Sequence, residues 1–145
     1  PCSAVWAISR DYRIREAWDP FSHETRVVGN NTAIRIGTPV RVTSRHGLQM
    51  EVEYVQFSAP RKAAIVMKNG PPFFEAFAGS WLFAPISDQA TFARFRYVFK
   101  AKPKSLAPLI EKFARLYFEK VVSDRLQGLK RYCEAQDGRK QIDSN

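Results

Sequence analysis

Residues 5–21 read VWAISRDYRIREAWDPF, a short amphipathic segment that runs into a Trp-Asp-Pro step. The spacing of its apolar side chains predicts one or two short helices between Ser3 and Ala17, with Ser3 as the N-cap. Pro20 should end this helical region, because proline removes a backbone donor and restricts the residue before it. We expect Asp19 to form a turn and cap nearby backbone amides, and Trp18 to be packed.

Downstream, apolar and polar residues alternate in short runs, which is typical of strands with one face in the core and one in water. These runs predict six strands, at residues 25–29, 38–44, 48–57, 62–68, 76–83 and 93–100. Asn30 and Asn31 indicate a turn after the first run, and His46 with Gly47 indicates a tight turn between the second and third. Because the connections are short, the strands should form an antiparallel meander.

Two of these runs carry an aromatic face. In residues 76–83, Phe77 and Trp81 share one parity, and we take that side to face inward. In residues 93–100, Phe95 lies on the inward side, whereas Arg94 and Arg96 lie on the opposite side and should face solvent.

A single helix is predicted for residues 105–135, where apolar side chains recur every three or four positions. At 1.5 Å per residue it would be roughly 45 Å long, enough to lie across a curved sheet. Gly128 could bend it. Residues 1–136 are therefore predicted to form one domain, and residues 137–145 a polar tail with little order.

The order of these features resembles the START-like, or SRPBCC, superfamily of polyketide cyclase/dehydrase-type proteins. The resemblance rests on the Val-Trp pair, the Trp-Asp-Pro step, the strand with Gly79, Trp81 and Phe83, the later Thr91 and the terminal helix. It implies an α+β helix-grip fold, in which a curved antiparallel sheet of about six strands wraps around a long C-terminal helix, with one or two short N-terminal helices.

The resemblance also implies a first strand that this sequence does not show. Members begin with a strand before the Val-Trp helix, whereas this sequence begins at Pro1, where that strand should end. We therefore expect either further residues upstream or an open sheet edge that pairs with another chain, as in a homodimer.

Composition sets the broad class. The chain has 145 residues, 45% of them hydrophobic, and a net charge of +9. It has neither an apolar run of roughly 18 residues nor a signal-peptide pattern, so we expect a soluble, cytoplasmic protein. Cys2 and Cys133 form no CxxC pair, and both are expected to be reduced. The dispersed basic residues indicate a solvated surface first and anionic partners second.

The space between the predicted sheet and helix has two interpretations. In one it is a ligand cavity, and in the other the aromatic side chains fill it as a solid core. Tyrosine hydroxyls favour the cavity, because each needs a partner when buried. The candidate lining residues are Tyr54, Phe77, Trp81, Phe95, Tyr97, Phe113 and Tyr117.

Catalytic and metal signals are weak. His23 and His46 are the only histidines, and neither belongs to a metal-ligand pattern, so no metal is expected. Tyr97 and His23 are the weak catalytic candidates, although a surface histidine is the more ordinary interpretation of His23. Glu75 could lie at a pocket mouth. No GxSxG or nucleotide-binding motif is present, and no cofactor is expected.

Three functions follow from these observations. The leading hypothesis is binding of an apolar or aromatic small molecule, which the resemblance suggests is a lipid, a polyketide or a quinone-like compound. The first alternative is a polyketide cyclase or dehydratase that uses the same cavity. The second is a basic interaction module for RNA, ribosomes or an anionic membrane.

Overall fold

The structure is a computed structural model that describes residues 1–29 and 33–142, with side chains up to Asp137. The segment before the sheet is helical, as predicted: α1 spans Cys2–Arg10, a 3-10 turn spans Tyr12–Ile14, and α2 spans Arg15–Trp18. Ser3 was predicted as the N-cap, but it lies inside α1, which begins one residue earlier after Pro1. Asp11 separates the helices, and its carboxylate accepts a hydrogen bond from the Arg13 amide.

Six antiparallel strands follow in chain order, which confirms the predicted meander. They are β1 (Ser22–Val27), β2 (Pro39–Ser44), β3 (Gln49–Ser58), β4 (Lys62–Asn69), β5 (Phe74–Pro85) and β6 (Thr91–Ala101). The register shifts between β1 and β2, between β3 and β4, and between β5 and β6. Such bulges bend strands, so the sheet curves around the space on its inner face.

The predicted turns have different outcomes. Gly47 has a φ of +80° in the tight turn between β2 and β3, which confirms the prediction there. The Ser44 side chain stabilises that turn by accepting a hydrogen bond from the Leu48 amide. The turn predicted at Asn30 and Asn31 lies outside the described residues.

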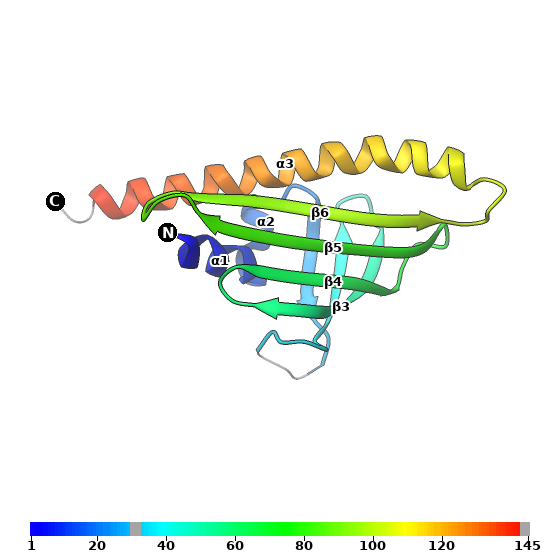
Figure 1. Cartoon of the computed structure of the whole chain (residues 1–145), viewed down its shortest axis with the longest axis horizontal. Coiled ribbons are helices and arrows are strands. Elements are labelled where there is room, and N and C mark those ends of the chain that lie inside the picture. The colour runs from blue at the N-terminus through cyan, green and yellow to red at the C-terminus, as the bar shows by residue number, and fades with distance from the viewer. Residues whose placement is uncertain (30–32, 143–145) are drawn as a thin grey trace.

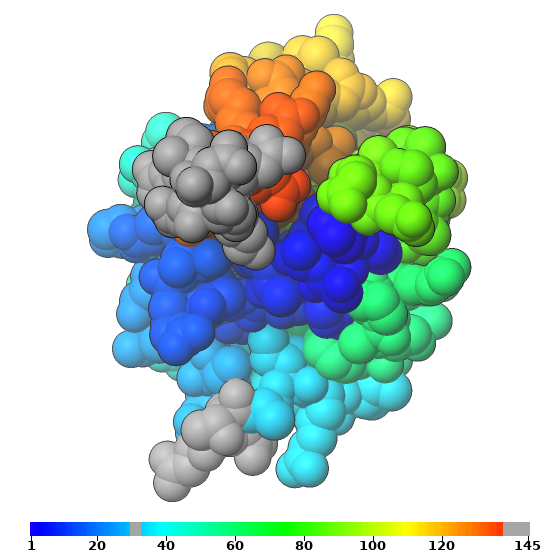
Figure 2. All heavy atoms as spheres, turned by 90° about the vertical axis from the view of Figure 1, so that its left-hand side faces the viewer, coloured from blue at the N-terminus to red at the C-terminus, as the bar shows by residue number. Residues whose placement is uncertain are grey.

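The long helix α3 spans Ala107–Ile142, so it runs beyond the predicted end at residue 135 and into the predicted tail. It extends along β6 for the length of the molecule, while α1 and α2 lie near its C-terminal half (Figure 1). From that end, the dark blue N-terminal helices lie between α3 and the strands (Figure 2). The N-terminal helices therefore close one end of the space between sheet and helix.

The core of the fold is aromatic. Trp81 and Phe83 on β5 stack at 5.6 Å between ring centroids, and Trp6 of α1 meets Phe83 edge-on. This confirms that the aromatic face of β5 points inward. The buried hydrophobic cluster is Trp6, Trp18, Val40, Val52, Tyr54, Ala63, Trp81, Phe83 and Leu129.

Gly128 allows α3 to approach the N-terminal helices closely. A Cβ atom at this position would lie 2.0 Å from the Trp18 carbonyl oxygen, which is backbone and cannot move aside cheaply. The helix continues without a break through Gly128, where we predicted a possible bend. The role of this glycine is to let α3 contact the backbone at Trp18.

We expect Gly128→Ala to lower the free energy of unfolding by about 1–3 kcal/mol, because overpacking against fixed backbone outweighs the better helix propensity of alanine. Urea unfolding monitored by circular dichroism measures this. Ser123→Ala, at an exposed position of the same helix, is the matched control and should change stability little. A Gly128→Ala protein more stable than the wild type would contradict the close contact.

Candidate functional site

A cavity of about 110 Å³ lies between the inner face of the sheet, α3 and the N-terminal helices. All six strands contribute to its wall, and most of the lining is apolar. Val42, Met50 and Ile65 line it from β2, β3 and β4, while Phe118 and Val121 line it from α3. The space is therefore not a solid core, which was the alternative interpretation of the aromatic pattern.

Four of the seven residues predicted to line the cavity do so. Tyr54, Phe77, Trp81 and Phe95 all border it, and they come from β3, β5 and β6. Tyr54 and Trp81 are almost fully buried. Each of the four has the parity that we took as inward on its strand, which for Phe77 and Trp81 was the aromatic side.

The other three lie elsewhere. The Tyr97 hydroxyl donates to the Arg115 carbonyl oxygen at 3.4 Å, at the rim between β6 and α3. Tyr117 lies edge-on to the His46 ring and lines a separate pocket with Phe21. Phe113 is 63% exposed. Only one stripe of α3 faces the cavity, and the apolar spacing of this helix does not distinguish that stripe from its other faces.

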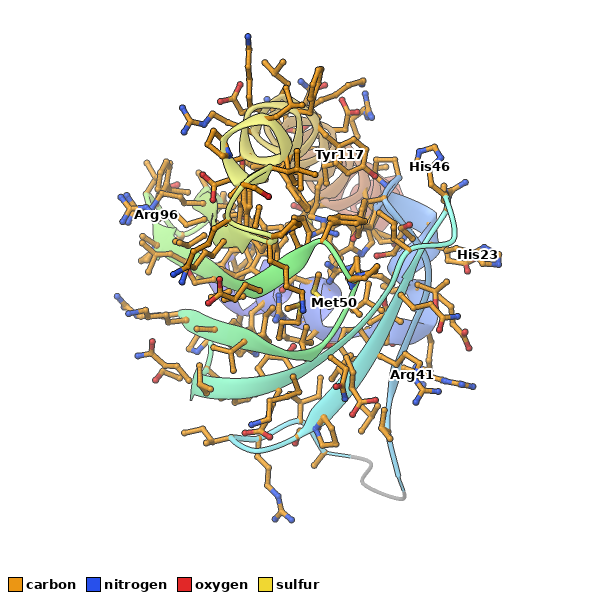
Figure 3. The ribbon with its side chains drawn as sticks, turned by 90° about the vertical axis from the view of Figure 1, so that its right-hand side faces the viewer. His23, Arg41, His46, Met50, Arg96 and Tyr117 are labelled. Atoms are coloured by element: carbon orange, nitrogen blue, oxygen red, sulfur yellow. The ribbon has the colours of Figure 1, made fainter. Side chains whose placement is uncertain are left out.

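The histidines and exposed charges lie on the outside. Figure 3 shows His23, His46 and Arg96 projecting away from the interior, whereas Met50 lies within the curve of the sheet. The His23 side chain is 70% exposed, with Nδ1 3.8 Å from a Glu16 carboxylate oxygen. Glu75 pairs with Lys100 at 2.8 Å on the surface. Neither weak catalytic candidate, Tyr97 or His23, borders the cavity.

The polar end of the cavity contains residues that the sequence analysis missed. Nη1 of Arg10 donates to the Tyr54 hydroxyl at 3.0 Å, and that hydroxyl lies 2.5 Å from the Tyr12 hydroxyl. Burial, with the neighbouring Tyr54, raises the pKa of Tyr12 above its ordinary value, so its hydroxyl stays protonated. One signal was available: Arg10 lies four residues after Trp6, so both share one face of α1.

A second polar cluster borders the cavity beside the first. Arg15 Nε lies 2.7 Å from a carboxylate oxygen of Asp19, and Arg125 Nε lies 3.1 Å from the same oxygen. Ser22 Oγ and the Phe21 amide also donate to Asp19, which has no exposed surface. The predicted capping role of Asp19 is therefore confirmed, and Trp18 is packed as predicted, but the two arginine partners were not foreseen.

The charges in this cluster perturb one another. Burial alone would raise the pKa of Asp19, but the guanidinium groups of Arg125 and Arg15 outweigh it and bring the pKa down from 3.8 to about 2. Asp19 is therefore ionised at neutral pH. One carboxylate thus pairs with two guanidinium groups. Arg10 brings a third guanidinium group to the cavity wall.

Three further findings concern metal ligands, thiols and membrane spans. Within residues 1–29 and 33–142, no group of three or more His, Cys, Asp or Glu side chains could hold a metal ion. Both cysteines are free, and burial raises the pKa of the Cys133 thiol to about 11. No described helix is long and apolar enough to cross a membrane.

The family described as polyketide cyclase / dehydrase and lipid transport matches residues 1–134. The chain belongs to this family. The resemblance predicted from the Val-Trp pair, the Trp-Asp-Pro step and the order of strands is thereby confirmed. A comparison with curated proteins finds no match.

Solved structures share the fold of this polyketide cyclase/dehydrase family member. A protein of Thermus thermophilus gives a TM-score of 0.73 at 15% identity, over 94% of this chain and 91% of that one. A START superfamily protein of Mycobacterium smegmatis gives a TM-score of 0.72 at 12% identity, over 93% of this chain and 90% of that chain. The di-domain ARO/CYC BexL from the BE-7585A biosynthetic pathway gives a TM-score of 0.69 at 12% identity, over 90% of this chain and 43% of that chain. At these identities the likeness shows the helix-grip fold alone.

We expect Asp19→Asn to destabilise this family member by about 3–5 kcal/mol at pH 7, because two buried guanidinium groups lose their carboxylate. The pKa of Asp19 is lower in the folded than in the unfolded protein. Its ionised carboxylate therefore adds to the free energy of unfolding above about pH 4, and this contribution is lost as the pH falls through about 2. The shift corresponds to about 2 kcal/mol.

Urea unfolding of both proteins between pH 2 and pH 7 measures the two effects together. The difference between wild type and variant should shrink toward low pH. Asp11→Asn is the control, because Asp11 pairs with Arg13 on the surface, and its effect should be small. Equal effects of the two substitutions would contradict the role assigned to Asp19.

Proposed function

We propose that this protein binds an apolar or aromatic small molecule in the cavity between the sheet and α3. The observation that carries the proposal is the cavity itself, which has walls from every strand, a mostly apolar lining and a few polar side chains. This combination is the usual form of a small-molecule site. Membership of a family described by polyketide cyclisation and lipid transport supports it.

The volume favours a small ligand. Apolar cavities of ~150 Å³ bind benzene, so a cavity of about 110 Å³ is on the scale of one aromatic ring. A long acyl chain or a multi-ring polyketide would require α3 to move away from the sheet. Among the ligand classes that the resemblance suggested, a single ring of quinone-like size therefore fits best.

Burial of one ring sets the expected affinity. Roughly 150–200 Å² of apolar surface at 25 cal/mol per Å² gives about 4–5 kcal/mol, before the costs of association. A bare hydrocarbon ring should therefore bind with a Kd near the millimolar range.

The polar groups in the cavity favour binding over catalysis. Tyr12 has a raised pKa and Tyr54 accepts from Arg10, so both hydroxyls are better placed to orient a ligand than to remove a proton. A cyclase or dehydratase would have to use these groups, because Tyr97 and His23 do not border the cavity.

We expect toluene to bind the wild-type protein and to lose binding in Val42→Trp, because the indole would occupy the cavity. Saturation-transfer NMR with millimolar toluene measures this. Val55→Trp is the matched control, since Val55 is an exposed position of β3, and it should leave the toluene signal unchanged. Toluene binding that survives Val42→Trp, or that is absent from the wild type, would overturn the proposed site.

A second candidate function is favoured by the outer face of α3. Four large apolar side chains, spaced three or four residues apart, lie along one side of α3 and the residue just before it. They are Leu106, Leu109, Phe113 and Leu116, and each is more than half exposed. Exposed basic residues accompany them: Lys102, Lys104, Lys112, Arg115 and Lys120. An apolar stripe with basic flanks is typical of a helix that lies on an anionic bilayer surface, and we propose that occupant for it.

We expect the protein to sediment with vesicles of phosphatidylcholine containing 30% phosphatidylglycerol. In the variant with Leu109→Glu and Phe113→Glu, the fraction of protein that sediments with the vesicles should fall about fivefold or more. Ile86→Glu is the control, because Ile86 is at least as exposed as Leu109 and Phe113 but lies in the hairpin beyond β5, at the other end of the molecule (Figure 1). Equal sedimentation of the two variants would contradict the assignment.

A further inference from the structure

Arg10 has an unsatisfied donor beside the cavity. Its Nε donates to Ser9 Oγ at 3.2 Å and its Nη1 donates to the Tyr54 hydroxyl at 3.0 Å. Its Nη2 is buried, and within the described part of the chain it has no hydrogen-bond partner. A buried guanidinium nitrogen without an acceptor is unfavourable, so a ligand oxygen at this position would complete the group.

Aromatic rings fix the guanidinium group in place. The Arg10 guanidinium carbon lies 5.5 Å from the centre of the Trp6 ring and 5.9 Å from that of Trp81. These contacts partly compensate the charge, but a ring face accepts no directed hydrogen bond in the plane of the guanidinium. The charge is therefore held in one orientation while Nη2 remains without an acceptor.

The charges around the cavity do not balance. Arg10, Arg15 and Arg125 all border it, and Asp19 pairs with Arg15 and Arg125. Among the described residues, no carboxylate lies within salt-bridge distance of Arg10. Burial lowers the pKa of Arg125, and the positive charges of Arg15 and Arg10 act in the same direction against the attraction of Asp19. The cavity wall thus carries excess positive charge, which favours an anion.

A second polar atom on the wall also lacks a partner. Thr25 on β1 lines the cavity, and its hydroxyl is buried without a hydrogen-bond partner among the described residues. A hydroxyl can donate to an anionic oxygen as well as accept. A ligand oxygen on this part of the wall would satisfy it.

We propose that the cavity takes a single aromatic ring bearing an anionic oxygen, such as a carboxylate, which Arg10 binds through Nη2. This inference rests on the proposed ligand-binding function and names its ligand class. The apolar walls would hold the ring, and the charge-assisted hydrogen bond to Arg10 would set its orientation.

Benzoate, benzamide and toluene are suitable probes, because they share one ring and differ in the group that would meet Arg10. Their affinities are measured at pH 7 by ligand-detected NMR titration on the wild type, Arg10→Met and Arg13→Met. Arg13 is the matched control, since it lies three residues away with its side chain 89% exposed. Circular dichroism and thermal unfolding establish that each variant is folded.

We expect the wild type to bind benzoate at least tenfold more tightly than benzamide or toluene. Arg10→Met should weaken benzoate at least tenfold and leave toluene unchanged, and Arg13→Met should change neither. The comparison of benzoate with its neutral isostere benzamide needs no variant, so it tests the proposal even if Arg10→Met does not fold.

The outcomes separate the two proposals. If toluene binds but benzoate binds no more tightly than benzamide, or is unaffected by Arg10→Met in a folded protein, the anion site is wrong and the cavity stands. If toluene does not bind the wild type, the proposed function itself is overturned.

Discussion

The buried carboxylate of Asp19 joins the two ends of the chain. It accepts hydrogen bonds from Arg15 on α2, from Ser22 at the start of β1, and from Arg125 on α3, which is 106 residues away in sequence. Because this carboxylate has no exposed surface, solvent and salt screen these attractions far less than they would at the protein surface. All donors meet it only when α2, β1 and α3 occupy their native positions, so this one group sets where the terminal helix crosses the sheet.

The rest of the cavity geometry follows from that crossing. Gly128 lies three residues after Arg125 and brings the α3 backbone against Trp18, so the helix is fixed by charge and by shape within about one turn. The preceding turns of α3 then present Phe118 and Val121 to the curved sheet. Since the sheet bends at its bulges and α3 is held against Trp18 beyond its midpoint, the space between sheet and helix is not closed by collapse of the side chains.

The sequence predicted the sheet better than the site, for physical reasons. Strand alternation is local, so the inward positions of Trp81 and Phe95 and the meander order could be predicted from neighbouring residues alone. The helix was harder, because apolar residues lie on both its buried and its exposed sides, and Phe113 was placed in the cavity for that reason. Arg10 and Arg125 were missed because arginine is mostly exposed in proteins, and the burial of Arg125 and of the Arg10 Nη2 atom depends on partners distant in sequence.

The same wall that stabilises the fold also limits what the cavity can accept. Arg15 and Arg125 both pair with Asp19, so their guanidinium groups have a partner and contribute mainly to stability. Arg10 is held by Ser9, Tyr54 and two tryptophan rings but keeps one donor without an acceptor. A donor that is fixed before binding has little freedom left to lose, so its hydrogen bond contributes more to affinity than that of a mobile side chain. Stability and recognition therefore oppose each other at this position, and a purely structural role would have favoured an apolar residue.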